Sequence, residues 1–372
     1  MARNRVIYQS EALYVSEDAA QTGSGKHEQL QRVQSANYSF NISRQDINQF
    51  GQLSRIDSLV LEAPTVSFDT TYYLGDGFNE ECLGFAKSSS FAVGFASGHM
   101  TATSGKNFYI VTEAEGIDIN SSDTAPNSVI GIGNAYLTDY TLDASVGSIP
   151  TVSVSFEAAN INSASSNLSG TSDGISGIPI PAITQSDGTA LTDLVAIPSP
   201  TTGVGSITAL RPGDISITFG NASSDAEDGP IVDISGDADG AHVQSASLSL
   251  SMSRSPLERL GSRFPFARTV DFPITASLSV SAIVNEVSAS NLTNVIDQQN
   301  GVDIQLTFNQ RGGSTAAASY KLVNAKLDSE SFSSAIGSNK TVDLTFSTQI
   351  GGPSDTTNNI LFSGANLTTP FA

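Results

Sequence analysis

The sequence predicts an all-β fold, built from β-sandwich or barrel domains with one short helix each. Charged residues make up only 15% of the 372 positions, so the charged, Ala/Leu-rich stretches typical of long helices are missing. Serine and threonine occur in almost every short window, together with 32 glycines, as expected for many short strands joined by turns. In several segments apolar and polar residues alternate with a period of two, which is typical of strands with one buried face.

The clearest alternating segment occurs twice. Residues 33–44 read VQSANYSFNISR and residues 243–254 read VQSASLSLSMSR, which gives seven identities in twelve at an offset of 210. Chance matching of serine-rich strands is the alternative, but glycine and proline also recur downstream in register. Six positions of this repeat are candidates for assembly contacts: Arg44, Gly51 and Pro64 in the first copy, and Arg254, Gly261 and Pro273 in the second. Gly51 and Gly261 share the offset of 210, whereas Pro64 and Pro273 are 209 apart.

A second repeated block follows in the same order. Residues 134–156 align with 324–346 at an offset of 190, and alternating strands such as Val152 to Phe156 and Val342 to Phe346 recur within it. The smaller offset predicts about twenty extra residues between the blocks of the first copy. We expect them in the Gly/Ser-rich stretch 84–107.

The repeat divides the chain into two β-domains and a connection. The first domain is expected at 1–161, a Pro/Gly/Ser-rich connection at 162–206, and the second domain at 207–372. A connection of this length is a tether, a small surface subdomain or disordered, and its composition indicates no core of its own. The short helices are expected at 79–83 and 288–299, the latter stopped before a glycine.

Charge and cysteine content exclude several classes of protein. Seventeen Lys and Arg against 37 Asp and Glu give a net charge of −20, so the average surface repels phosphate, which argues against a DNA-gripping role. The single Cys82 rules out an intramolecular disulfide and fits a reducing cytosol. No signal peptide and no apolar run long enough to span a bilayer are apparent.

No catalytic, cofactor or metal site is expected, and the chain is not predicted to be an enzyme. His27, His99 and His242 lie in unrelated contexts without zinc spacing. The Gly131–Gly133 pattern lacks the third glycine of a dinucleotide site and is interpreted as strand or turn. Residues 235–240 resemble the start of a calcium loop, but Ala246 stands where a bidentate Glu is required.

Three segments together resemble the major tail tube proteins of long-tailed bacteriophages. They are the opening MARNRVIYQSEALYVS, the stretch from Gln29 to Leu74, and the stretch from Arg254 to Val284, and they look like a tube domain written twice. The resemblance implies a structural protein of the virion tail, assembled in the bacterial host cytoplasm, whose rings stack into a hollow tube for genome passage. An acidic chain suits such a conduit, because cations on its wall would retain phosphates.

Two domains in one chain depart from the family's usual single domain and hexameric ring. The resemblance therefore implies self-association into homotrimeric, pseudo-sixfold rings stacked head to tail, with other tail proteins at the tube ends and DNA passing without specific binding. We expect the inner wall to be polar and acidic, and residues 162–206 to lie outside the tube or over a neighbouring chain. A repeated surface-layer or adhesin-type protein is the alternative, and the missing signal peptide argues against it.

Overall fold

The fold is all-β, as the sequence predicts. The structure is a computed structural model, and it describes residues 11–17, 26–103, 105–113, 119, 126–167, 175–184, 186–200, 210–220, 242–283, 301–337, 339–365 and 370–371. Two short α-helices accompany the strands in this part of the chain. Below, the first half means the described residues up to 200, and the second half means those from 210 onward.

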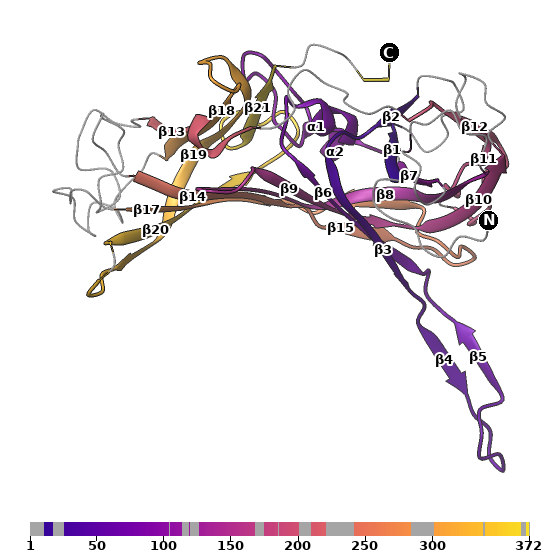
Figure 1. Cartoon of the computed structure of the whole chain (residues 1–372). Helices are drawn as coiled ribbons and strands as arrows, with labels where there is room; N and C mark the ends of the chain where they lie inside the picture. The colour runs from indigo at the N-terminus through magenta and orange to yellow at the C-terminus, as the bar shows by residue number, and fades with distance from the viewer. Residues whose placement is uncertain are drawn as a thin grey trace.

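One arched antiparallel sheet runs through both halves (Figure 1). Its strands follow the order β3-β6-β9-β8-β14-β17-β20-β19. Their bounds are β3 (Val33–Asn41), β6 (Thr65–Tyr73), β9 (Thr151–Ala158), β8 (Pro126–Ser145), β14 (His242–Ser251), β17 (Ile274–Ile283), β20 (Thr341–Ile350) and β19 (Ala316–Ser333). Because side chains alternate across a strand, one face of the arch is apolar and the other polar.

The two longest strands leave the arch and continue into covering strands on its apolar side. The beginning of β8 pairs with β7 (Lys106–Thr112) and β10 (Asn160–Asn167). Strand β7 pairs on its other side with β1 (Glu11–Ser16), which pairs with β2 (His27–Gln29). The beginning of β19 pairs with β18 (Val302–Asn309) and β21 (Ile360–Gly364), and β18 pairs with β13 (Ile215–Gly220). Each half is therefore a sandwich whose core lies between arch and cover.

Corresponding strands of the two halves pair in the same register. Ser39 faces Ser67 in β3 and β6, and Ser249 faces Ser277 in β14 and β17, an offset of 210 on both sides. The offset falls to 196 between β7 and β18 and to 190 between β8 and β19. Most of the expected twenty-residue difference therefore precedes β7, and the rest lies between β7 and β8. Pro64 directly precedes β6, and Pro273 directly precedes β17. Because β6 and β17 are related by an offset of 210 residues, the equivalent of Pro64 is position 274, and Pro273 lies one residue before it.

The two helices lie on the apolar side of the arch. Helix α1 (Phe78–Leu83) is the one expected at 79–83, and it buries Cys82. Helix α2 (Ser97–Thr101) lies in the stretch where the sequence predicted only extra residues. Between them, the rings of Phe85 and Phe95 stack at 4.2 Å and both lie edge-on to Tyr140 of β8. The helix expected at 288–299 lies outside the described residues.

The expected connection contains more structure than its composition indicates. Strand β10 runs through position 161 to Asn167, and β11 (Ile175–Pro179) pairs with β12 (Leu194–Ile197). This small hairpin covers a second hydrophobic core together with β1 and β7; its buried members include Ile178, Ile180, Val195 and Ile197. The expectation that 162–206 lacks apolar residues for a core is therefore wrong, because isolated Ile and Val residues between Pro, Gly and Ser suffice to cover one face.

Candidate assembly interface

The two halves meet in a seam between the end of β8 and β14. The seam consists of facing residue pairs from Asp139–Ser251 to Ser145–Ser245. Its apolar side chains belong to the main core: Tyr140 and Leu142 from β8 are fully buried, as are Leu248 and Leu250 from β14. One continuous backbone ladder and one continuous core therefore connect the halves.

The arch ends at β3 in the first half and at the end of β19 in the second half, and these two strands correspond to the two that form the seam. The counterpart of β14 in the first half is β3, where Tyr38 is 41% and Phe40 59% exposed, against 1% for Leu248 and 0% for Leu250. The counterpart of the end of β8 is the end of β19, where Phe332 is 50% exposed and its equivalent Leu142 is buried. Within the described part of the chain, β3 pairs with β6 alone, and Lys326–Ser333 of β19 with β20 alone. We call these two strand segments the outer edges.

The six candidate residues lie at the ends and tips of two equivalent two-stranded arms. They do not form one cluster. The first arm consists of β4 (Arg44–Ile47) and β5 (Asp57–Val60), and the second of β15 (Arg254–Leu257) and β16 (Ala267–Val270). Arg44 and Arg254 begin the arms, while Pro64 and Pro273 follow them. Gly51 and Gly261 form the tips with φ of 88° and 85°, a left-handed conformation that favours glycine.

The two arms differ in what they contact. The first arm extends alone from the body, with Phe50 and Leu53 fully exposed at its tip (Figure 1). The second arm lies against the first half, where Arg268 forms an ion pair with Glu157. Three further contacts fix it. Arg254 donates a hydrogen bond to the backbone carbonyl of His99, and the Arg254 and Arg268 guanidinium groups lie 4.9 and 5.7 Å from the Tyr136 ring centroid.

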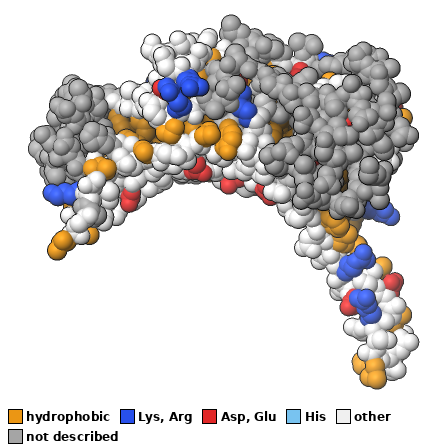
Figure 2. All heavy atoms as spheres, viewed as in Figure 1, with side chains coloured by type: hydrophobic (Ala, Val, Ile, Leu, Met, Phe, Trp, Pro, Cys, Tyr) orange, Lys and Arg blue, Asp and Glu red, His pale blue; other side chains and the backbone are white. Residues whose placement is uncertain are grey.

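The polar face of the arch is concave and acidic. Figure 2 shows carboxylates along this underside. The strands β3, β6, β9, β14, β17 and β20, and the seam part of β8, contain no Lys or Arg. Their carboxylates are Asp69, Asp139, Asp143, Glu157 and Asp343.

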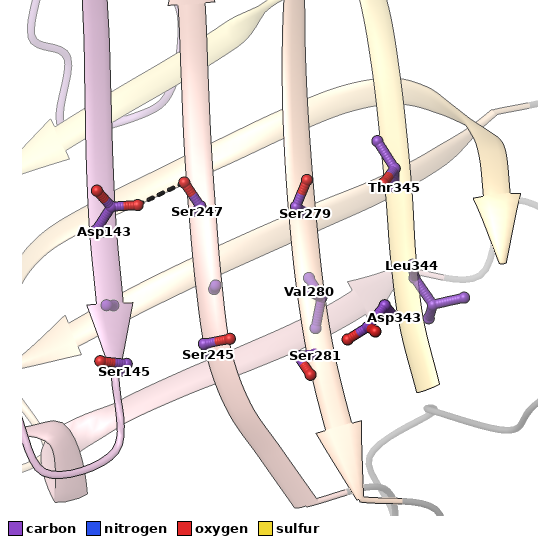
Figure 3. A pocket seen from close by; sticks show the side chains of 12 residues that line it. Asp143, Ser145, Ser245, Ser247, Ser279, Val280, Ser281, Asp343, Leu344 and Thr345 are labelled. Atoms are coloured by element: carbon purple, nitrogen blue, oxygen red, sulfur yellow. Dashed lines mark hydrogen bonds between the residues drawn. The ribbon is translucent and has the colours of Figure 1, made fainter. Parts of the chain in front are cut away.

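An open hollow of about 480 Å³ lies on this face across the seam (Figure 3). Serines on β14 and β17 form its floor between Asp143 and Asp343, and the Ser247 hydroxyl donates a 2.6 Å hydrogen bond to Asp143 across the seam. The lining contains no cationic or aromatic side chain, so it lacks the groups that hold phosphates or stack bases.

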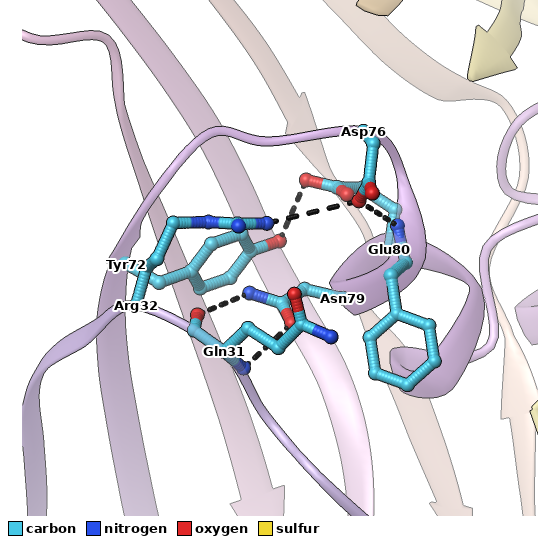
Figure 4. A network of polar contacts seen from close by, with 7 residues as sticks. Gln31, Arg32, Tyr72, Asp76, Asn79 and Glu80 are labelled. Atoms are coloured by element: carbon cyan, nitrogen blue, oxygen red, sulfur yellow. Dashed lines mark hydrogen bonds and ion pairs between the residues drawn. The ribbon is translucent and has the colours of Figure 1, made fainter. Parts of the chain in front are cut away.

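A buried polar network fixes α1 on the first half (Figure 4). The Tyr72 hydroxyl donates a 3.0 Å hydrogen bond to Glu80, and the Asn79 side chain accepts from the backbone N–H of Gln31 and donates to its carbonyl. The Nη2 atom of Arg32 lies 3.7 Å from Oδ1 of Asp76. Burial raises the pKa of Glu80 from 4.5 to about 7, although the Tyr72 hydrogen bond and the Arg32 charge act in the opposite direction. The network is structural, because its members are enclosed within the fold.

Two of the three histidines, His27 and His99, are buried. Burial lowers the pKa of His27 to about 4 and that of buried His99 well below its usual value. No group of three or more His, Cys, Asp and Glu in the described residues could hold a metal ion. Gly131 and Gly133 lie within β8 against Pro181, as the strand interpretation predicts. The calcium-like segment 235–240 lies outside the described residues.

Comparisons with known protein families and with curated proteins find no match to this chain. No helix in the described part of the chain has the length and apolar character needed to cross a membrane. The seam and the outer edges were not singled out from the sequence. A signal for them exists, because the repeat carries Tyr38 and Phe40 where the second copy carries leucines.

Proposed function

We propose that this chain is a structural virion protein that polymerises into stacked rings forming a bacteriophage tail tube. The observation that carries the proposal is the arched sheet, in which two halves of equal strand register join edge to edge into one curved wall. A curved wall that ends in two strand edges can be continued by further copies, and an edge strand offers unpaired backbone groups for this purpose.

The concave face is the bore of the proposed tube. Its strands other than β19 carry Ser, Thr, Asn and carboxylates without Lys or Arg, and β19 adds Lys326 opposite Ser347. Few side chains of these strands could therefore retain phosphates by ion pairing. The serine floor over the seam presents short side chains that leave the passage open. A genome would therefore pass along this wall without specific binding.

Three chains would complete one ring. Each chain supplies two sandwiches of like register, so three chains provide six quasi-equivalent positions around the bore. The covalent link between halves replaces every second contact between separate chains and raises the effective concentration of the partner sandwich. Rings would stack head to tail, and other tail proteins would cap the tube. The β11–β12 hairpin covers β1 and β7 on the convex side, which supports an outer position for the connection.

Negative-stain microscopy of the purified chain tests this function. Hollow rings or tubes are expected, with three chains and six lobes in an averaged cross-section. Dispersed monomers, or rings of six chains, would contradict the proposal.

A matched variant tests the bore. Ser279→Arg with Ser281→Arg places cations on the exposed and half-buried floor of the hollow, and it should leave rings intact while assembled tubes gain affinity for duplex DNA that weakens with salt. Equal DNA retention by tubes of this variant and by tubes of the unsubstituted protein would show that this face does not line the passage.

A further inference from the structure

The seam inside one chain is a template for a contact between chains. We propose that the β3 edge of one chain pairs antiparallel with the β19 edge of a second copy, in the register of the β8–β14 seam. This inference deepens the proposed function by naming the partner of the outer edges and the residues that meet there.

The register follows from the equivalence of the halves. In the seam, Leu248 faces Leu142 and Ser249 faces Thr141. The offsets of 210 and 190 convert these positions into Tyr38 facing Phe332 and Ser39 facing Ser331. The full set of interchain pairs runs from Ser35–Ala335 through Asn37–Ser333 and Ser39–Ser331 to Asn41–Ser329.

The exposed apolar residues are those that such a contact would cover. Tyr38, Phe40 and Phe332 are about half exposed, whereas their seam counterparts Leu248, Leu250 and Leu142 are buried. Ile42 at the end of β3 follows the same rule, since it is 38% exposed and its counterpart Met252 is buried. Side chains facing each other across an antiparallel pair interact directly, and an aromatic pair such as Tyr38–Phe332 is favourable.

A second copy is the occupant because only the chain itself carries both halves of the template. The outer edge on β3 has the strand pattern of β14, and the outer edge on β19 continues the strand that corresponds to β8. Three positions differ in charge: Glu330 stands where the seam has Tyr140, and Ser329 and Ser333 stand where it has Asp139 and Asp143. The apolar side of the contact between chains is therefore more polar than that of the seam, and its polar side carries less charge.

Paired cysteines test the register directly. Residues facing each other in an antiparallel pair have Cα atoms 4.5–5.5 Å apart, within disulfide reach. Ser39→Cys with Ser331→Cys uses two positions of the polar face and leaves the core untouched, and Cys82 is buried and does not compete. Mild oxidation should link the β3 edge of each chain to the β19 edge of the next chain in the same ring. The product should be a closed covalent trimer on a non-reducing gel.

Three controls define the result. Thr141→Cys with Ser249→Cys, the same pair within the seam, should form a disulfide inside one chain and no trimer. Ser39→Cys with Ser333→Cys is out of register by two residues and should link about tenfold more slowly. Each single variant should give no ladder beyond dimers.

The outcomes separate this inference from the proposed function. Rings in the microscope with faster linking by the out-of-register pair would overturn the register and leave the tube function standing. In-register linking into open chains without rings would support the register and contradict the tube. The absence of both rings and cross-links would overturn both.

Discussion

Strands β3 and β14 have the same pairing register and opposite exposure. Phe40 is 59% exposed on β3, and Leu250 at the equivalent place on β14 is fully buried. Both strands alternate, and both pair on one side with an equivalent strand. Among the described residues, only β14 has a neighbouring strand on its other side, the end of β8. Burial at these positions is therefore set by the neighbouring sandwich and not by the strand.

The two arms give the same lesson. Each begins at an arginine and turns at a left-handed glycine. The second arm packs because the first half offers Glu157 and Tyr136. Phe264 of that arm also lies so close to Gly188 that a Cβ there would collide with its ring. The first arm has no such surface within its own chain among the described residues, and it projects freely.

The largest expected contrast comes from truncating the equivalent apolar residues. Leu250→Ala should destabilise the monomer by about 2–5 kcal/mol, because it opens a cavity in the shared core. Phe40→Ala should change monomer stability by less than about 0.5 kcal/mol and instead weaken assembly. Urea unfolding at low protein concentration and sedimentation at high concentration measure the two effects. Similar destabilisation by both variants would mean that β3 is already covered in the monomer.

The buried network of the first half should make stability depend on pH. Position 282, the counterpart of Tyr72, is Ala, so the second half lacks this tyrosine. Because the pKa of Glu80 is raised from 4.5 to about 7 in the fold, the folded state holds the proton more tightly. This stabilising contribution is complete below pH 4.5 and is lost as pH rises through 7. The loss is on the order of 3 kcal/mol.

Glu80→Gln should remove most of that loss between pH 5 and pH 8, measured by urea unfolding at both values. Tyr72→Phe is the matched control, because removing the donor that favours the ionised form raises the pKa of Glu80 further and extends the loss to higher pH. An unchanged pH profile in the glutamine variant would assign the dependence to other groups.

Gly105 and Gly301 should be equally intolerant of substitution. A Cβ on Gly105 would lie 2.5 Å from the Asn134 carbonyl carbon, and one on Gly301 2.4 Å from that of Asn324. Both asparagines have a left-handed backbone, with φ of 55° and 54°. Each glycine-to-alanine change should cost about 1–3 kcal/mol, measured by thermal unfolding. A large effect at only one site would break the equivalence of the halves here.

The smallest expected contrast concerns the arms. Arg268→Ala should cost about 1–2 kcal/mol, since Arg268 is largely buried between Glu157 and Tyr136. In the first arm Arg55 pairs with Asp46 while both side chains are mostly exposed, so Arg55→Ala should cost less than about 0.5 kcal/mol. Amide hydrogen exchange should accelerate in the second arm alone. Equal acceleration in both arms would show that the second arm is not docked.

Local pattern predicted much of the fold. The alternation of β3 and β14 identified both strands, and the helix at 79–83 was expected from its place in the repeat, where it corresponds to residues 288–299. The β11–β12 hairpin was missed because neither strand alternates apolar and polar residues: β11 reads ISGIP with an irregular register, and β12 reads LVAI. In the candidate site, the repeat pointed to the arms through Arg44 and Gly51, but it did not point to the outer edges.

The sequence by itself determined the all-β class, the offsets that recur in strand pairing, and the excess of acidic residues. These are properties of spacing and composition, which every copy of a strand carries with it. Only the tertiary structure decided that β8 meets β14, and that Tyr38 and Phe332 therefore remain at the ends of the arch. A pattern of period two indicates that one face of a strand is buried. The partner along the edge of the strand is joined by backbone hydrogen bonds, which every residue type except proline can form, so the pattern does not name that partner.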